Sequence, residues 1–593
     1  MNDMIAIPTS LATRAATSRR SAHVAPDCRG LNFFELDRDL RALLPLYMDQ
    51  PLLAHLTPHF RDLGELAGGR LGELSDAAER HPPELHARDR FGRDEEWLEF
   101  HPAYRRMEEI AFGRFGMHAM THRPGVLGWH EAMPPLAKYL FHYLFAQAEF
   151  GLLCPVNVTD SSSALVERYG SAEIKARYLD RMWSQDLSKL LRSAQFMTEK
   201  AGGSDVGAAD LMAVRDGDDW RLYGEKWFCS CADADVAVLL ARPEGARDGG
   251  RGLGLFLMPK TLEDGTRNAY RVVRLKDKLG SRSMASGEIV FEGAVAYQLG
   301  DLDRGLKQML EMVNSSRISH LTRAAGMMRR CLNEALQAAS HRNAFGHTVI
   351  EYPLMRRQLL KLMVPTEQAL SALFYAATIS GREDAHARSV LRLLTPIFKY
   401  RACRDNVTVA TGSMEARGGN GYIEDWPNAR LVRDAHLGLI WEGTSNINSL
   451  DAVQRAVGKE RAHLALLEDL TDRIAGAGLP GQFRTRLEGA LGRAVRFAEE
   501  VAGSAEYERF CRIASGQLYH AVTAALMAME GATLGAAGGD ARRLILARCV
   551  LEHRMQEAQP LSLSAFKWED TATSLLLGDA PVSLAVAVAV LQE

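Results

Sequence analysis

Residues 197–205 read MTEKAGGSD, and the periodicity of the chain changes at this point. From residue 31 to residue 193, apolar side chains recur every three or four residues, as they do along helices. From residue 194 to residue 302, short runs rich in Val, Leu, Tyr and Phe alternate with Gly, Asp and Asn turns, which predicts the strands of a small β-domain. Helical spacing returns at residue 303. The sequence therefore predicts an α+β multidomain chain with segregated helices and strands.

The length and the two ends of the chain predict further parts. The 593 residues exceed what one hydrophobic core normally holds. Residues 303–455 are expected to form a helical bundle, and residues 456–593 a helical extension interrupted by glycines at 476–478 and 538–539. Residues 1–30 are rich in Ala, Ser, Thr and Arg without an apolar run, which predicts a disordered tail; a transit peptide is the alternative.

Composition excludes several functional classes. The net charge of −3 and the pI near 6.7 provide no strong field for nucleic acid or an acidic membrane. No apolar run reaches the roughly 18 residues that span a bilayer. The eight cysteines show neither a disulfide framework nor zinc spacing, which is typical of a reducing compartment. We therefore expect a cytoplasmic protein without a membrane partner or a bound metal.

A second stretch, GLIWEGTSNINS at residues 438–449, places the carboxylate of Glu442 directly after an apolar run and a tryptophan. Apolar neighbours disfavour the charged form of a carboxyl group and raise its pKa. Proteins often keep a carboxyl group in such surroundings where a reaction needs a base. The alternative is a surface loop in which Glu442 is simply solvated.

Three more short stretches suggest a ligand site, although each is weak alone. They read KWFCS at 226–230, RNAFG at 342–346 and GGNGY at 418–422. The glycines and hydroxyls of MTEKAGGSD expose backbone N–H groups that suit carbonyl or phosphate oxygens, but the Rossmann and P-loop spacings are absent. The aromatic pair in KWFCS fills a core in most proteins, and it could instead stack on a flat cofactor.

Taken in order, TEKAGGSD, KWFCS, RNAFG, GGNGY and WEGTS resemble the motifs of the acyl-CoA dehydrogenase family, and MTEKAGGSD, LKDKLGSRS and IWEGTSNI are most similar to its AidB-like branch. The resemblance extends from about residue 100 to residue 455. It implies an N-terminal helical domain (31–193), a β-barrel domain (194–302) and a four-helix bundle (303–455), followed by the extra helices. It also implies FAD as the cofactor and a homodimer or homotetramer.

The resemblance assigns Glu442 as the catalytic base that removes the α-proton of an acyl-CoA thioester, while the β-hydrogen leaves as hydride to flavin N5. Trp441, Gly443 and Arg317 would lie beside the substrate, Arg317 near the CoA pocket. A minority of the family carries its base at the position of Ser316, where this chain has no carboxylate. Trp441 replaces the more common tyrosine, which could narrow the acyl channel.

The flavin contacts implied by the resemblance come from all five motifs. Ser204 would approach the flavin phosphate or the thioester arm, and Arg342 and Phe345 would reach the cofactor of a neighbouring subunit. The remaining cofactor contacts are Phe196, Met197, Thr198, Phe228, Ser230, Gly418, Gly419 and Thr444.

Two other sets of side chains are interpreted as structural. His118 and His122 lie on one helix face, but no third ligand is evident, and a catalytic zinc normally needs three. Arg329–Arg330 and Arg356–Arg357 are expected to be solvated helix faces.

Two alternatives to an acyl-CoA dehydrogenase that passes electrons to an electron-transfer flavoprotein stay open. One is an acyl-CoA oxidase. The other follows from the AidB-like branch and is a flavoprotein of the alkylation response that binds duplex DNA through its last domain. DNA binding needs clustered Lys and Arg, whereas residues 456–593 contain 14 Lys and Arg against 17 Asp and Glu. A stripe of Arg484, Arg486, Arg493 and Arg496 is the one candidate surface, and the enzyme is favoured.

Overall fold

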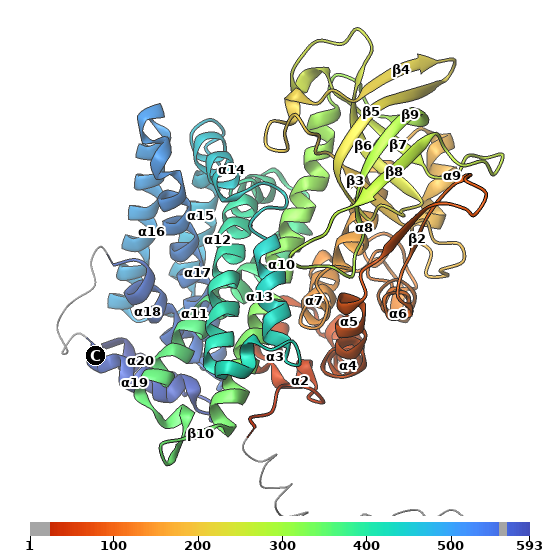
Figure 1. Ribbon diagram of the computed structural model, residues 1–593. Coiled ribbons are helices and arrows are strands. Elements are labelled where there is room, and N and C mark those ends of the chain that lie inside the picture. The colour runs from red at the N-terminus through yellow and green to blue at the C-terminus, as the bar shows by residue number, and fades with distance from the viewer. Residues whose placement is uncertain (1–23, 557–565, 593) are drawn as a thin grey trace, which may run out of the picture.

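The strand-rich segment after residue 193 forms a seven-stranded sheet in the computed structural model, which describes residues 24–556 and 566–592 (Figure 1). Its strands are β3 (Ser193–Phe196), β4 (Met212–Asp216), β5 (Asp219–Ser230), β6 (Val236–Pro243), β7 (Gly254–Pro259), β8 (Tyr270–Leu275) and β9 (Ser286–Leu299). Pairing runs β6–β4–β5–β9–β7 and returns from β7 to β6, so the sheet closes on itself. The predicted β-barrel is therefore present.

The barrel has its own core because alternate residues of its strands point inward. Leu222, Leu239, Phe256 and Ile289 come from four different strands and are all 0% exposed. β5 and β9 pair antiparallel from Trp220 opposite Ala296 to Ser230 opposite Ser286. This long pairing carries the KWFCS motif to the end of the barrel that faces the helices.

Helices precede the barrel, as predicted, but a hairpin interrupts them. The helices are α2 (Phe33–Leu36), α3 (Arg38–Tyr47), α4 (Gln50–Gly68), α5 (Arg70–Arg80), α6 (Pro102–Glu108), α7 (Pro135–Ala146), α8 (Leu153–Tyr169) and α9 (Ala172–Met182), and the hairpin is β1 (Glu84–Arg88) with β2 (Asp94–Glu99). Glu96 fastens the hairpin to the barrel by accepting hydrogen bonds from Arg267 Nη2 at 2.5 Å and from the backbone N–H of Val272 at 3.1 Å. The purely helical expectation for this region was wrong because tertiary contacts hold these strands.

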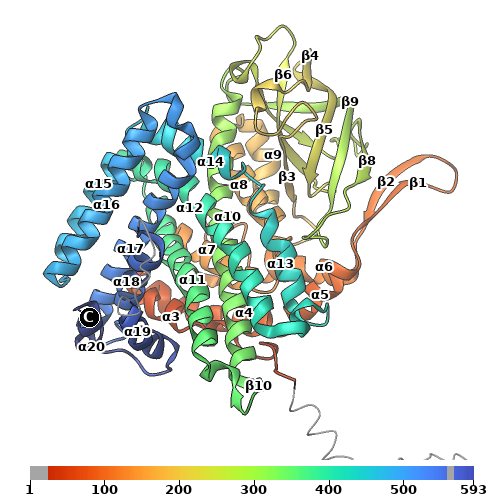
Figure 2. The ribbon, with the colours of Figure 1, turned by 60° about the vertical axis from the view of Figure 1, so that its left-hand side comes forward.

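Four helices form the bundle that was predicted after residue 303. They are α10 (Gly305–His341), α11 (Pro353–Ser380), α12 (Ala385–Arg417) and α13 (Pro427–Leu437). α10 packs against α11, α12 and α7 and also contacts β6 and β7. Figure 2 shows α10 at the boundary between the barrel and the other bundle helices. This long helix therefore joins the two domains along one side of any site between them.

The remaining helices extend the bundle. After α14 (Ser445–Leu450) and a π-helical turn (Asp451–Val457) come α15 (Ala462–Gly476), α16 (Gly481–Ala502), α17 (Cys511–Ala536), α18 (Arg542–Arg554), α19 (Lys567–Leu577) and α20 (Leu584–Gln592). α15 and α17 pack on α12, and α17, α18 and α19 pack on α11. The helix ends agree with the predicted glycine interruptions. No helix among the described residues has both the length and the apolar character needed to cross a membrane.

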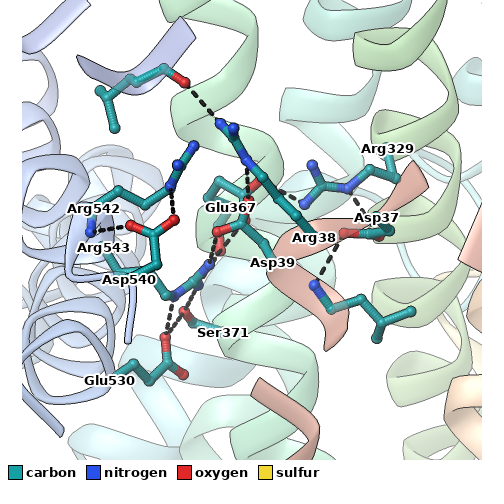
Figure 3. A network of polar contacts seen from close by, with 12 residues as sticks. Asp37, Arg38, Asp39, Arg329, Glu367, Ser371, Glu530, Asp540, Arg542 and Arg543 are labelled. Atoms are coloured by element: carbon teal, nitrogen blue, oxygen red, sulfur yellow. Dashed lines mark hydrogen bonds and ion pairs between the residues drawn. The ribbon is translucent and has the colours of Figure 1, made fainter. Parts of the chain in front are cut away.

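A buried network of charged groups fastens this extension to the rest of the molecule (Figure 3). Arg543 of α18 contacts Glu367 at 2.9 Å, Glu530 at 2.8 Å and Asp39 at 3.3 Å. Arg329 of α10 bonds the same Glu367 carboxylate at 2.5 Å. Arg329 and its neighbour Arg330 are 5% and 4% exposed, so the expectation of a solvated arginine pair there was wrong. Both are buried with carboxylate partners.

The predicted tail, residues 1–30, lies outside the described residues up to residue 23. Beyond that point the chain is already packed. Cys28 is 0% exposed, and its N–H donates to Glu334 Oε1 at 3.1 Å. The fold therefore begins before the predicted boundary at residue 31.

Candidate active site

A cavity of about 1280 Å³ lies between the barrel and the bundle. Its wall comes from the segment after β3, the end of β5, one face of α10 and the loop between α13 and α14. Pockets for one drug-sized ligand measure about 300–1,000 Å³, so this cavity has room for more than one such molecule. The wall contains eight Lys and Arg side chains and five Asp and Glu side chains. That balance favours anionic ligands.

Glu442 lies in the cavity wall on a loop with an unusual backbone. The residue has a φ of +54°, in the left-handed region that side chains rarely adopt, and Gly443 follows with a φ of +93°. Asn448 Nδ2 donates to the carbonyls of Gly443 at 2.7 Å and Glu442 at 3.3 Å. Arg317 Nε also donates to Glu442 O at 3.3 Å, and Lys399 Nζ to Gly443 O at 2.5 Å. Such over-determined strain is common at functional sites.

Burial raises the pKa of the Glu442 carboxyl above its ordinary value, because the surrounding protein disfavours its charged form. The positive charges of Arg317, Lys399 and Arg323 oppose that shift. Burial likewise lowers the pKa of the Lys399 ammonium to about 8. Glu442 remains partly exposed to the cavity, so a ligand there can reach a carboxylate made more basic by its surroundings.

A buried ion pair fixes the part of the wall that comes from residues 197–198 and 228–230. Lys226 Nζ lies 2.5 Å from Glu199 Oε1, and the two side chains are 0% and 5% exposed. The Glu199 carboxylate also accepts hydrogen bonds from the backbone N–H groups of Asp210 at 2.6 Å and Leu211 at 3.2 Å. The MTEK segment is thereby tied to the KWFCS strand, and the N–H of Trp227 donates to Thr198 O at 2.8 Å.

The family of the chain follows from comparison with known proteins. A model of the N-terminal domain of the adaptive response protein AidB matches residues 24–188, and models of the acyl-CoA dehydrogenase middle and C-terminal domains match residues 194–294 and 303–458. Acyl-CoA dehydrogenase family member 11 of Caenorhabditis elegans is 34% identical over 450 residues, 72% of this chain and 71% of that protein. The chain belongs to the acyl-CoA dehydrogenase family.

Further comparisons agree with this acyl-CoA dehydrogenase assignment. Escherichia coli (strain K12) AidB is 34% identical over 434 residues, covering 70% of this chain and 76% of that protein. The crystal structure of Caenorhabditis elegans ACDH-11 in complex with C11-CoA superposes with a TM-score of 0.81 and 27% identity, covering 94% of this chain and 96% of that one. The fold and the AidB-like resemblance inferred from the sequence are therefore confirmed.

The structure gathers most of the residues expected to form an acyl-CoA dehydrogenase site into the cavity wall. Phe228 is 53% exposed, and Lys276 Nζ lies 4.9 Å from its ring centre. Phe196 is 2% exposed at the end of β3 and is absent from the wall. The predicted residues that line the cavity are Met197, Thr198, Ser204, Phe228, Ser230, Arg317, Trp441, Glu442, Gly443 and Thr444.

Four predicted cofactor residues lie elsewhere, at the end of the bundle that Figure 1 labels β10 (Asn343–Ala344). Arg342 caps the end of α10, and Gly418 caps the end of α12 with a φ of +78°. A Cβ at Gly418 would lie 2.8 Å from Arg342 Nη1, so a larger residue there would displace that guanidinium. Gly419 follows, and Phe345 is 95% exposed. These residues share one surface that is separate from the cavity of the same chain.

Several residues that position the site escaped the sequence reasoning. Asn448 and Lys399 hold the Glu442 loop, and Glu199 and Lys226 hold the part of the wall from residues 197–198 and 228–230. Lys278 is a further member of the wall, and burial lowers its pKa to about 8. Glu199 and Lys226 both stand in the quoted motifs, but the sequence gives no sign that they pair across 27 residues. Only the folded chain brings them together.

The histidine pair expected to be structural lies in a turn and not on a helix face as predicted, and both histidines have protein partners. His118 Nε2 lies 3.1 Å from Ser184 O, and His122 Nε2 lies 3.0 Å from Asp160 Oδ1. Among the described residues, the one group with metal-ligand spacing is Glu84, His86 and Glu99, on the exposed β1–β2 hairpin. It lies on a different element from the cavity wall.

Proposed function

We propose that this protein is an FAD-dependent acyl-CoA dehydrogenase that introduces an α,β double bond into an acyl-CoA thioester, with Glu442 as the base. The observation that carries the proposal is the Glu442 carboxyl itself. It lines the cavity, burial raises its pKa, and four hydrogen bonds fix the two carbonyls beside it. The related ACDH-11, solved with C11-CoA, supports the substrate class.

The cavity fits a flavin dinucleotide. The half-exposed ring of Phe228 offers a stacking face, and the hydroxyls of Thr198 and Ser230 supply polar contacts in the same wall. The excess of positive side chains favours pyrophosphate. Arg342 beside Gly418 would bind the dinucleotide of a second subunit. When bound, the flavin of FAD supplies the acceptor for a hydride.

The residues of this chain have three tasks in the reaction. Glu442 removes the α-proton, and its raised pKa makes it a stronger base than a solvated glutamate. The backbone N–H of Glu442 would donate to the thioester oxygen, where negative charge develops. The apolar parts of the wall, including Trp441 and Ile447, exclude water from the carboxyl once a ligand fills the cavity.

The partners proposed for this reaction are an electron-transfer flavoprotein as the acceptor of electrons and a second or further copy of the chain in a homodimer or homotetramer. The alternative function, duplex-DNA binding by an AidB-like flavoprotein, is less favoured. Arg486 of the candidate arginine stripe pairs with Glu552 at 2.7 Å, and Arg484 lies 4.0 Å from Glu488. Both carboxylates reduce the positive charge that phosphates would need.

Anaerobic mixing of the FAD-loaded protein with a panel of acyl-CoAs tests the proposal. Bleaching of the flavin is expected with at least one chain, and Glu442→Gln is expected to slow it by about 10²–10⁴-fold because the general base is lost. Glu225→Gln is the control, since Glu225 is exposed and pairs with Lys200 outside the cavity wall. Absence of bleaching with every acyl-CoA, together with salt-sensitive binding of duplex DNA, would contradict the proposal.

A further inference from the structure

Arg323 of α10 lines the cavity and is 2% exposed. The described part of the chain contains nine buried arginines, and eight of them have a carboxylate within 4.0 Å. Arg323 has none. A buried charge without a partner is costly unless something else compensates it. The exception therefore needs an explanation at this site.

Aromatic rings compensate the charge of Arg323 only in part. The guanidinium carbon lies 5.1 Å from the ring centre of Phe150 and 5.7 Å from that of Trp441. Cation–π contacts of this kind stabilise the charge, but the rings do not replace hydrogen-bond acceptors for the N–H groups. Two weak bonds use two of the five donors: Nε to Ser319 O at 3.4 Å and Nη2 to His320 Nε2 at 3.3 Å. Nη1 has no hydrogen-bond partner in the described chain.

His320 provides a second unused donor in the same wall. Because a guanidinium can only donate, His320 Nε2 must accept the Arg323 hydrogen bond, so the neutral ring carries its proton on Nδ1. That atom also has no partner among the residues that the structure describes. Burial and the charge of Arg323 hold the pKa of His320 well below its usual range, so the ring is neutral. Arg323 and His320 are three residues apart on α10 and lie on one face.

The position of these donors relates them to the proposed reaction. Arg317 of the same helix bonds the carbonyl of Glu442. Arg323 follows six residues later, about 9 Å further along α10 at the usual rise of a helix. Six residues also turn the helix by about 240°, so Arg317 and Arg323 do not share a face of α10, but both line the cavity. An acyl chain that extends from Glu442 along the α10 side of the cavity would bring its distal end to Arg323 and His320.

We propose that Arg323 and His320 bind an anionic oxygen group on the acyl chain, so that the preferred substrate is a CoA thioester of a dicarboxylic acid. The proposal rests on the proposed function, because it assumes that the acyl group lies in the Glu442 cavity. Arg323 Nη1 and His320 Nδ1 are covered in the unliganded chain, so a carboxylate would bind them after small rotations of the two side chains. It would then supply the acceptors that they lack and neutralise the buried guanidinium. A planar carboxylate matches the guanidinium fork, which makes the contact selective against a methyl terminus.

Equilibrium binding to the FAD-loaded Glu442→Gln variant, which blocks turnover, provides the test. The probes are glutaryl-, adipoyl-, suberoyl- and sebacoyl-CoA. Each is compared with the monocarboxylic straight-chain acyl-CoA of the same carbon number, which ends in a methyl group. At one length or more, the dicarboxylic thioester is expected to bind about tenfold tighter or better, as charged hydrogen bonds do. Equal or tighter binding of the monocarboxylic chain at every length would overturn the inference.

Matched variants assign the preference to the two residues. Arg323→Met is expected to abolish the preference, and His320→Phe to reduce it, whereas Arg455→Met removes another wall arginine and leaves the ratio of the two affinities unchanged. An equal loss of both ligands in Arg323→Met would contradict the assignment. If that variant does not fold, the preference of the parent protein and the His320→Phe result still decide the question.

Two controls complete the test. The first asks whether Arg323 binds the carboxylate of the substrate or a free anion, and the second separates failure of this inference from failure of the proposed function. If sodium formate raises the affinity for octanoyl-CoA to that for suberoyl-CoA, the partner of Arg323 is a free anion and the inference fails. If straight-chain thioesters bleach the flavin and dicarboxylic ones neither bind better nor bleach it, the inference fails while the proposed function stands. If dicarboxylic thioesters bind better and no thioester bleaches the flavin, the proposed function fails and the ligand class is supported.

Discussion

At the scale of single residues, Glu442 combines a strained backbone with a carboxyl group whose charge is disfavoured by burial. A non-glycine residue in the left-handed region costs on the order of 1–3 kcal/mol, and here the amide of Asn448 holds it in place by donating to the carbonyls of Glu442 and Gly443. The neighbouring cations limit the rise in pKa of the carboxyl. These charges therefore set the pH at which the proposed base becomes active.

The pH dependence of flavin reduction follows from this balance. The proposed base acts when it is deprotonated, so the rate should fall as pH decreases through a pKa that lies above the ordinary glutamate value of 4.5. Lys399→Gln keeps a hydrogen-bond donor near Gly443 but removes a positive charge that lowers this pKa, so the acidic limb should move to higher pH. Stopped-flow reduction over a pH series measures the limb. A limb at the same pH in both proteins would contradict the assignment of Glu442.

At the scale of elements, the Glu199–Lys226 pair attaches the loop after β3 to β5. Breaking one partner of a buried pair leaves an uncompensated charge and costs about 3–5 kcal/mol. Lys226→Met should therefore lower the urea midpoint of unfolding strongly. Lys200→Met is the matched control, because Lys200 pairs with Glu225 at the surface with 55% and 42% of the side chains exposed, and exposed pairs contribute about 0–1 kcal/mol.

The urea midpoints of these two variants can contradict the prediction. Equal midpoints for Lys226→Met and Lys200→Met would show that the buried pair does not stabilise the wall. A Lys226→Met, Glu199→Leu double variant should recover much of the loss, since an apolar pair of similar volume leaves no buried charge.

Sequence patterns predicted elements well where the periodicity of the chain is local. The change at residues 197–205, the barrel strands and the bundle helices all follow from spacing that neighbouring residues determine. The β1–β2 hairpin did not follow, because Glu96 stabilises it through barrel residues 267 and 272, far away in sequence. Arg329 and Arg330 resembled a solvated pair because Asp37 and Glu367, the partners of Arg329, come from distant segments of the chain. The resemblance supplied Glu442, but Arg323 required the folded wall.

At the scale of the whole molecule, the extension after residue 455 is bound to the core by buried charge as well as by apolar packing. Arg543 connects α18 with Glu367 of α11, Glu530 of α17 and Asp39 of α3 (Figure 3). The network therefore unites the start of the fold, the bundle and the last domain. We expect these parts to lose structure together.

Arg543→Met tests that expectation. The change leaves buried carboxylates with fewer partners, so the stability should fall by about 3–5 kcal/mol, and limited proteolysis should cut more readily in the extension and near α3. Arg486→Met is the control, because Arg486 pairs with Glu552 at the surface with 44% of its side chain exposed. Unchanged protease resistance in Arg543→Met would show that apolar packing alone holds the extension.

Glu442 and Arg323 belong to different elements of the fold, and this has a consequence for how such a protein can diversify. The carboxyl is held by a loop whose anchor is Asn448 of α14, whereas the unpaired guanidinium projects from α10. A substitution at position 323 can therefore alter the choice of acyl tail without displacing the group that removes the proton, but the loss of its positive charge would raise the pKa of Glu442 further. The place of the base and the choice of tail are thus set by different elements, whereas the basicity of Glu442 remains linked to the charges of α10.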